Sequence, residues 1–170
     1  MDIKLDLKDR KILAELDIDP NINSTLLAKK IGTSRQVIEY RLNKLISQNT
    51  IHKFYTLIDV SMLGYSWFRV YVRLKNVREE TYTHFAKQLY AQYAVFWIAY
   101  ISGSYDLIID IFAENANEFN AIFSKILQEN KGIIQSYDPM IIFELDIYNY
   151  SHFLEKKSLR NKIIMYKNID

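Results

Sequence analysis

The chain has 170 residues, 49% of them hydrophobic and 25% charged, and this composition excludes intrinsic disorder. It contains no cysteine, which excludes disulfides, thiolate metal sites and cysteine nucleophiles. The first residues lack the apolar stretch of a secretory signal, and no apolar run approaches the ~18 residues of a membrane span. We therefore expect a cytoplasmic protein with no membrane partner.

The net charge of +2 is unevenly distributed along the chain. Residues 23–55 carry six basic residues against one acidic residue, a net +5, whereas residues 59–150 carry a net −4 and residues 151–170 a net +3. Such asymmetry favours a polyanion-binding module joined to a part that does not bind polyanions. A solvated helix surface is the alternative interpretation of the basic stretch.

A first helix is predicted to begin after Asp6, which is a suitable N-cap residue. Asp9 occupies the third helical position, where a side chain can return a hydrogen bond to the cap in the manner of a capping box. Residues 17–21 end this helix, because Pro20 disfavours helical geometry in the residue before it.

Two further helices are predicted on either side of a tight Gly-Thr-Ser turn. Asn23 or Ser24 caps the first, Gly32 ends it with a left-handed backbone, and Ser34 caps the second. The spacing of apolar residues gives the second helix a buried face composed of Ile38, Leu42 and Leu45. This arrangement is typical of a helix-turn-helix.

Residues 50–58 alternate well enough to predict a strand, which would form a short wing after the second of these helices. Residues 59–65 are interpreted as a hinge. The chain is therefore divided into a winged helix-turn-helix domain at 1–58, the hinge, a second domain at 66–150, and a tail at 151–170 that is either a short helix or a packed arm.

The second domain shows a different pattern, in which strands alternate with helices. In residues 67–75, apolar and polar side chains alternate as in a half-buried antiparallel strand. The predicted order is β-α-β-β-α-β, a ferredoxin-like sandwich, and the fold class is α+β. The elements are expected at 67–75, 79–92, 95–102, 105–113, 116–130 and 133–149, the last as one strand or a strand pair.

Five stretches, in this order and spacing, resemble the Lrp/AsnC (feast/famine) family of transcription regulators. They correspond to the family's first helix, its turn, the end of its recognition helix, the end of its hinge and a Gly-x-x-Asp turn in its sensing domain: residues 5–13, 27–34, 40–45, 63–64 and 103–106. The resemblance implies a sequence-specific regulator that binds pseudo-palindromic double-stranded DNA as a homo-dimer, or as a tetramer or octamer.

Two features depart from the family pattern. The family usually has Gly-Val-Ile where this chain has Asn49, Thr50 and Ile51. Because Asn tolerates a left-handed backbone, the turn into the wing is expected to survive. The second departure is the 20-residue tail, which is longer than the resemblance predicts.

The start of the second helix of the pair supplies the candidate base-reading residues Ser34, Arg35 and Gln36. Arginine pairs with guanine and glutamine with adenine in the major groove. Further candidate DNA contacts are Tyr40, which can pack on a thymine methyl or reach a phosphate, and the phosphate-binding Arg41, Lys44 and Lys53. The alternatives are that Arg35 and Gln36 sit in water and that Arg41 pairs with an acid such as Asp9 or Glu15.

The resemblance places an effector-binding turn at Gly103, Ser104, Tyr105 and Asp106, with an amino acid or other small metabolite as its ligand. Asp106 can accept an ammonium group, and backbone N–H groups near Gly103 can hold a carboxylate. The alternative is a simple hairpin in which Asp106 caps the local backbone.

No cofactor or metal is predicted, because the three histidines, His52, His84 and His152, lack a metal-ligand spacing. The sirohaem decarboxylases have a similar two-domain architecture, and an enzyme of this class is the alternative interpretation of the chain. That class carries basic residues in the loop after the second strand of the sandwich, whereas this chain has none between Lys87 and Lys125. We therefore expect a regulator and not an enzyme.

Overall fold

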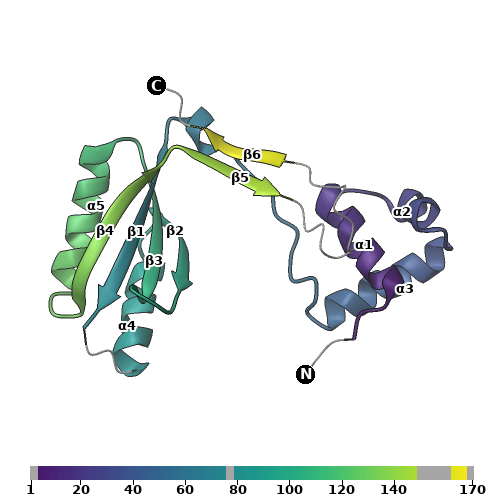
Figure 1. The fold of residues 1–170 in the computed structure, drawn as a ribbon, viewed down its shortest axis with the longest axis horizontal. Helices are drawn as coiled ribbons and strands as arrows, with labels where there is room; N and C mark the ends of the chain where they lie inside the picture. The colour runs from purple at the N-terminus through teal and green to yellow at the C-terminus, as the bar shows by residue number, and fades with distance from the viewer. Residues whose placement is uncertain (1–3, 76–78, 149–161, 168–170) are drawn as a thin grey trace. The chain divides into compact units, whose positions relative to one another are not determined.

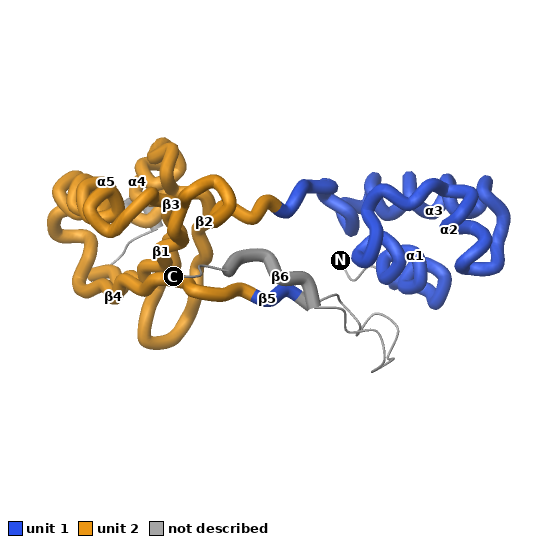
Figure 2. The backbone as a smooth tube through the Cα atoms, turned by 90° about the horizontal axis from the view of Figure 1, so that it is seen from above, with its two compact units in different colours: residues 1–57, 146–164 blue, residues 58–145, 165–170 orange. Residues whose placement is uncertain are grey.

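The structure is a computed structural model that describes residues 4–75, 79–148 and 162–167. The backbone separates into two compact units, one made of residues 1–57 and 146–164 and the other of residues 58–145 and 165–170 (Figure 2). The domain boundaries derived from the sequence stay predictions, and each unit is described by itself below.

The first unit contains three helices: α1 (Leu7–Ile18), α2 (Ser24–Ile31) and α3 (Arg35–Ser47). Each begins where the sequence predicted, because the side chains of Asp6, Asn23 and Ser34 accept hydrogen bonds from backbone N–H groups of the first turn. The capping box between Asp6 and Asp9 is present in full. Gly32 ends α2 at φ 75°, and α3 begins three residues later.

The three helices enclose a small apolar core. The tight turn brings α2 against α3, so that the small side chain of Ala28 and the apolar face of α3 pack together with α1. The fully or almost fully buried members of this core are Ile12, Leu27, Ala28, Ile38 and Leu45. The predicted helix-turn-helix is confirmed, and its core leaves the opposite face of α3 open to solvent.

The predicted strand at 50–58 is wrong. The backbone turns after α3 at Asn49, whose φ of 55° confirms the left-handed conformation expected there. Thr50 and Ile51 then donate to the carbonyl of Leu45, at 2.9 and 3.2 Å, and residues 52–58 run on as exposed chain outside any strand. Alternation alone does not form a strand without a partner for its backbone groups. A 3-10 helix, η1 (Val60–Leu63), follows.

The second unit confirms the ferredoxin-like order. A four-stranded antiparallel sheet in the order β2-β3-β1-β4 is combined with two helices (Figure 1). Its elements are β1 (Ser66–Leu74), α4 (Glu79–Tyr90), β2 (Val95–Tyr100), β3 (Leu107–Ala113), α5 (Ala116–Glu129) and β4 (Ile134–Ile142).

Both helices pack on the same face of this sheet. Phe85 of α4 and Phe123 of α5 join one core with Val70 of β1 and Ile109 of β3. The alternation predicted for 67–75 is confirmed, because Phe68, Val70, Val72 and Leu74 are buried in this core. The other face, which we call the open face, carries the remaining side chains of β1 and β3.

The C-terminal part of the chain forms a second, two-stranded sheet. Of the two alternatives for 133–149, one strand or two, the structure has two: β4 is followed after Phe143 by β5 (Glu144–Tyr148), which lies in a different sheet. β5 pairs with β6 (Lys162–Lys167). Within the tail predicted at 151–170 as a packed arm or a short helix, residues 162–167 form a strand, and pairing with β5 satisfies one edge of its backbone. Residues 151–161 and 168–170 of that prediction lie outside the described residues.

Candidate nucleic-acid interface

The N-terminal end of α3 presents the predicted base-reading residues to solvent. Ser34 is the cap residue, and its hydroxyl oxygen accepts from the N–H of Val37 at 3.3 Å. Arg35 and Gln36 open the helix, and the Arg35 side chain is 67% exposed. The helix N-terminus and two long polar side chains therefore point away from the core, as insertion into a groove requires.

Arg35 has a partner that the sequence analysis did not identify. Its Nε donates to a carboxylate oxygen of Glu39, one helical turn later, at 2.6 Å. The two side chains lie on the exposed surface of α3. The spacing of four residues was a signal for this pair, because side chains at i and i+4 are neighbours on a helix.

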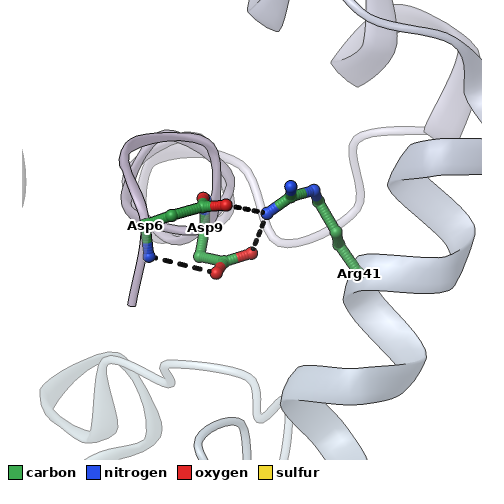
Figure 3. A network of polar contacts seen from close by, with 3 residues as sticks. All are labelled: Asp6, Asp9 and Arg41. Carbon is green, nitrogen blue, oxygen red and sulfur yellow. Dashed lines mark hydrogen bonds and ion pairs between the residues drawn. The ribbon is translucent and has the colours of Figure 1, made fainter. Parts of the chain in front are cut away.

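Arg41 points in a different direction from Arg35. Its Nη1 contacts carboxylate oxygens of Asp6 and Asp9, both at 2.7 Å, so that α3 is joined to the start of α1 (Figure 3). The Asp9 side chain is 5% exposed and that of Arg41 21%. The alternative weighed for Arg41, pairing with an acid of the first helix, is the arrangement that the structure shows.

This network shifts the pKa of Asp6 and that of Arg41. Hydrogen bonds from the backbone N–H of Asp9 and from the Arg41 guanidinium lower the pKa of Asp6 from 3.8 to about 2. The same contacts, first with Asp6 and then with Asp9, raise the pKa of Arg41. Asp6 and Arg41 therefore stay charged at neutral pH, and the positive charge of Arg41 is balanced within the domain.

The other predicted contact residues lie on exposed positions of the first unit. Tyr40 is 70% exposed on α3, Lys44 lies one turn after it on the same helix, and Lys53 follows in the exposed chain beyond the helix. A separate ion pair of 2.5 Å joins Lys30 of α2 to Glu15 of α1. Within the described residues, the structure therefore brings Ser34, Arg35, Gln36 and Tyr40 onto one helix but directs Arg41 inward.

The predicted effector turn joins β2 to β3. Gly103 has φ 141°, and the Ser104 carbonyl accepts from Arg73 at 2.9 Å. Asp106 is held by β1: its carboxylate accepts from the N–H of Leu74 at 2.8 Å, and its own N–H donates to the carbonyl of Val72 at 3.0 Å. One carboxylate oxygen of Asp106 therefore has a structural role at the end of the sheet.

The neighbouring Tyr105 extends this turn toward β4. Its hydroxyl donates to the carboxylate of Asp138, and this bond raises the pKa of Tyr105. Its ring lies 5.4 Å from that of Tyr71 on β1. Arg73 and Asp138 are thus polar residues beside the turn that the sequence analysis missed, because only the sheet register brings them there.

The open face of the sheet carries a charged pair among aromatic rings. Arg69 donates to both oxygens of Asp110, at 2.8 and 2.7 Å, and Asp110 has no exposed surface. The guanidinium carbon of Arg69 lies 5.5 Å from the ring centroids of both Trp67 and Trp97. Phe96 stacks on Phe112 beside them, with 3.6 Å between centroids.

The described part of the chain contains neither a metal-binding cluster nor a membrane-spanning helix. There, no cluster of three or more histidine, aspartate or glutamate side chains has an arrangement that could hold a metal ion. In the same ranges, every helix is too short or too polar to cross a membrane.

Comparison with protein families gives two matches that together span most of the chain. Residues 5–52 match a winged helix-turn-helix DNA-binding model, and residues 69–144 match the Lrp/AsnC ligand-binding domain. The first match covers the three helices around the exposed end of α3. The second covers the sheet and the turn at Gly103.

Individual proteins that are similar to this chain are also transcriptional regulators. The chain is similar to an uncharacterized HTH-type transcriptional regulator of Pyrococcus abyssi, with 30% identity over 82% of this chain and 93% of that protein. It is also 30% identical to the leucine-responsive regulatory protein of Rhizobium meliloti, over 69% of this chain and 76% of that one. A transcriptional regulator of Neisseria meningitidis, solved in complex with L-Met, has the same fold, with a TM-score of 0.75, 17% identity, and 87% and 96% coverage.

Proposed function

The chain belongs to the Lrp/AsnC family of transcriptional regulators, and from this premise we propose that it binds pseudo-palindromic duplex DNA sequence-specifically as a homo-oligomer. Its relatives are transcriptional regulators, which supports a regulatory and non-enzymatic role. In this proposal α3 is the recognition helix, and the sheet domain assembles the oligomer and binds an effector.

The observation that carries the proposal is that two arginines of α3 have different surroundings. Arg41 is neutralised by Asp6 and Asp9 and fixes α3 against α1. Arg35 extends into solvent from the first turn of the same helix. A helix that is anchored on its inner side and exposes polar side chains at its N-terminus has the geometry of a major-groove reader.

Base choice is assigned to Arg35 and Gln36, which suit guanine and adenine, with Ser34 and Tyr40 beside them. Lys44 and Lys53 are assigned to phosphates, since counterion release by Lys and Arg provides most of the non-specific affinity. Arg41 is reassigned from phosphate binding to holding the helix in place.

The open face of the sheet is the proposed dimer interface. It presents Trp97, Phe96 and Met140, which are 45, 42 and 49% exposed, around the Arg69–Asp110 pair. Aromatic residues, Met and Arg are enriched in the cores of interfaces. A dimer formed in this way would place two recognition helices about one DNA turn, ~34 Å, or a multiple of it apart, and dimers would assemble further into tetramers or octamers.

The turn at Gly103 is the proposed effector site, with an amino acid as the ligand class. The matched ligand-binding domain and the L-Met complex of the Neisseria protein support this class. Because Asp106 already accepts a bond from Leu74 and the Ser104 carbonyl accepts one from Arg73, the second Asp106 oxygen and the backbone N–H groups of Ser104 and Tyr105 are proposed to hold the ligand. An effector would act by binding one assembly more tightly than another.

The test is in-vitro selection from a randomised duplex pool at about physiological salt, followed by sequencing. We expect enrichment of a two-fold symmetric motif with half-sites one helical turn apart. If DNA is bound but the recovered sequences share no motif, the protein recognises DNA shape and does not bind a specific sequence. A failure to retain DNA with and without a mixture of amino acids would contradict the proposed function.

A further inference from the structure

Glu39 is an acidic residue on α3, the helix that we propose binds DNA. It is the only acid in the sequence between Asp19 and Asp59. It lies on α3, one turn after Arg35, and its side chain is 43% exposed. A carboxylate on a surface that approaches phosphates weakens every DNA complex through like-charge repulsion.

Stabilisation of the helix is a weak reason for this residue. An exposed ion pair at i and i+4 contributes only about 0.3–0.5 kcal/mol. The pair also has the less favourable direction, because the acidic member stands on the C-terminal side of the basic one and so opposes the helix dipole.

The geometry of the pair indicates a different role. Glu39 accepts from Nε of Arg35 at 2.6 Å, which fixes the plane of the guanidinium. The two terminal nitrogens of Arg35 remain as a fork of donors. A fork of this kind matches the O6 and N7 acceptors of guanine, whereas a freely rotating arginine also reaches phosphates.

We propose that Glu39 is a specificity-determining residue that positions Arg35 for guanine and lowers the affinity for every other duplex. This inference rests on the proposed function, since it assigns a role within the same recognition helix. Glu39 acts through Arg35 and reads no base itself. Its negative charge weakens binding to every duplex, and the orientation of Arg35 offsets this loss only where the matching guanine is present.

The experiment compares Glu39→Ala, Glu39→Gln, Arg35→Ala and the double variant Arg35→Ala/Glu39→Ala with the parent. Each is measured on two duplexes, the selected site and the same site with its guanine replaced. Glu15→Ala is the matched control, because it removes the same charge from another exposed ion pair of the domain. Circular dichroism establishes that each variant is folded, and fluorescence anisotropy gives the two dissociation constants.

Glu39→Ala is expected to bind the substituted duplex more tightly than the parent does and to lose roughly fivefold or more of the preference for guanine. Glu39→Gln keeps an oxygen acceptor for Nε, so it should retain most of the preference while also binding both duplexes more tightly. In an Arg35→Ala background, Glu39→Ala should leave the remaining base preference unchanged. Glu15→Ala should leave the preference at the parent's value.

Two outcomes would overturn the inference while the proposed function stands. If Glu39→Ala strengthens binding to both duplexes equally, the residue is only a repulsive surface charge. If it still changes base preference without Arg35, it reads a base directly. If the parent protein selects no motif, the proposed sequence-specific function is refuted. That result comes from the parent alone and does not depend on the Glu39 variants.

Discussion

At the scale of single residues, Arg41 shows how surroundings decide between two roles that the sequence leaves open. The sequence predicted the capping box of Asp6 and Asp9 from local spacing alone. It offered both DNA and an acid as the partner of Arg41, because Arg41 and Asp9 are 32 residues apart and only the packing of α3 on α1 brings them together. A carboxylate buried as deeply as that of Asp9 requires a partner charge.

This assignment predicts different effects for two neighbouring cations. Arg41→Ala should lower the free energy of unfolding by about 1–3 kcal/mol, because it leaves the buried Asp9 carboxylate without its cation. Lys44→Ala should leave stability within about 0.5 kcal/mol but reduce the slope of log affinity against log salt by about one. Urea unfolding and binding titrations at several salt concentrations measure the two effects. If the slope of log affinity against log salt is the same for Lys44→Ala as for the parent, Lys44 does not contact a phosphate.

The depressed pKa of Asp6 predicts how stability depends on pH. A carboxyl whose pKa falls on folding contributes stability that is complete above its unfolded value, 3.8, and is lost as the pH falls toward the folded value of about 2. Asp6→Asn keeps a good cap but removes this charge. We expect the parent to be more stable than the variant above pH 4, and the difference to shrink as the pH approaches 2. Urea midpoints between pH 2.5 and 6 test this, and a constant difference would contradict it.

At the scale of elements, the helices and the order of helices and strands along the chain were predictable, while the departures from regular alternation were not. Helix caps and apolar spacing are local, so α1, α2, α3 and α5 begin within one residue of the predicted positions. In β2, however, the register shifts between Val95 and Trp97. This irregularity places Phe96 and Trp97 on the same open face, where strict alternation would separate them. Residues 52–58 show the opposite case, because their sequence alternates but they form no strand.

Asn49 provides a test at this scale, because it is exposed and has a left-handed backbone. Its side chain contributes little packing, so substitutions report the cost of the backbone conformation. Asn49→Val should lower the free energy of unfolding by roughly 1–2 kcal/mol, since the branched Cβ of Val is strained in a left-handed backbone that the short polar side chain of Asn tolerates. Asn49→Gly should be tolerated within about 0.5 kcal/mol. Thermal and urea unfolding of both variants measure this, and equal stability of the two would show that the turn relaxes.

At the scale of the whole molecule, the sequence indicated two modules through its charge. The net +5 of residues 23–55 and the net −4 of residues 59–150 fall on the helical domain and on the sheet domain. The sequence indicated an aromatic second face for the strand at 67–75, including Trp67 and Tyr71, but not the charged pair within it. The Arg69–Asp110 pair and its two tryptophans come from three strands whose order follows only from the complete sheet. A polar pair enclosed by aromatic rings is a surface suited to specific self-association, because it disfavours imperfectly aligned partners.

The proposed dimer interface predicts the effect of one charge on this face. Met140 lies directly opposite Arg69 in the β1–β4 register and is 49% exposed, so Met140→Lys adds a second cation beside Arg69 without disturbing the helix-covered core. An interface formed by this face would have to bury that charge without a partner, which costs several kcal/mol. Analytical ultracentrifugation should then show a smaller species, and affinity for the two-fold site should fall toward that of a half-site. Tyr90→Lys adds the same charge at the end of α4, at a side chain that is 90% exposed, and should assemble like the parent. If Met140→Lys also assembles like the parent, the open face is not the contact that pairs the recognition helices.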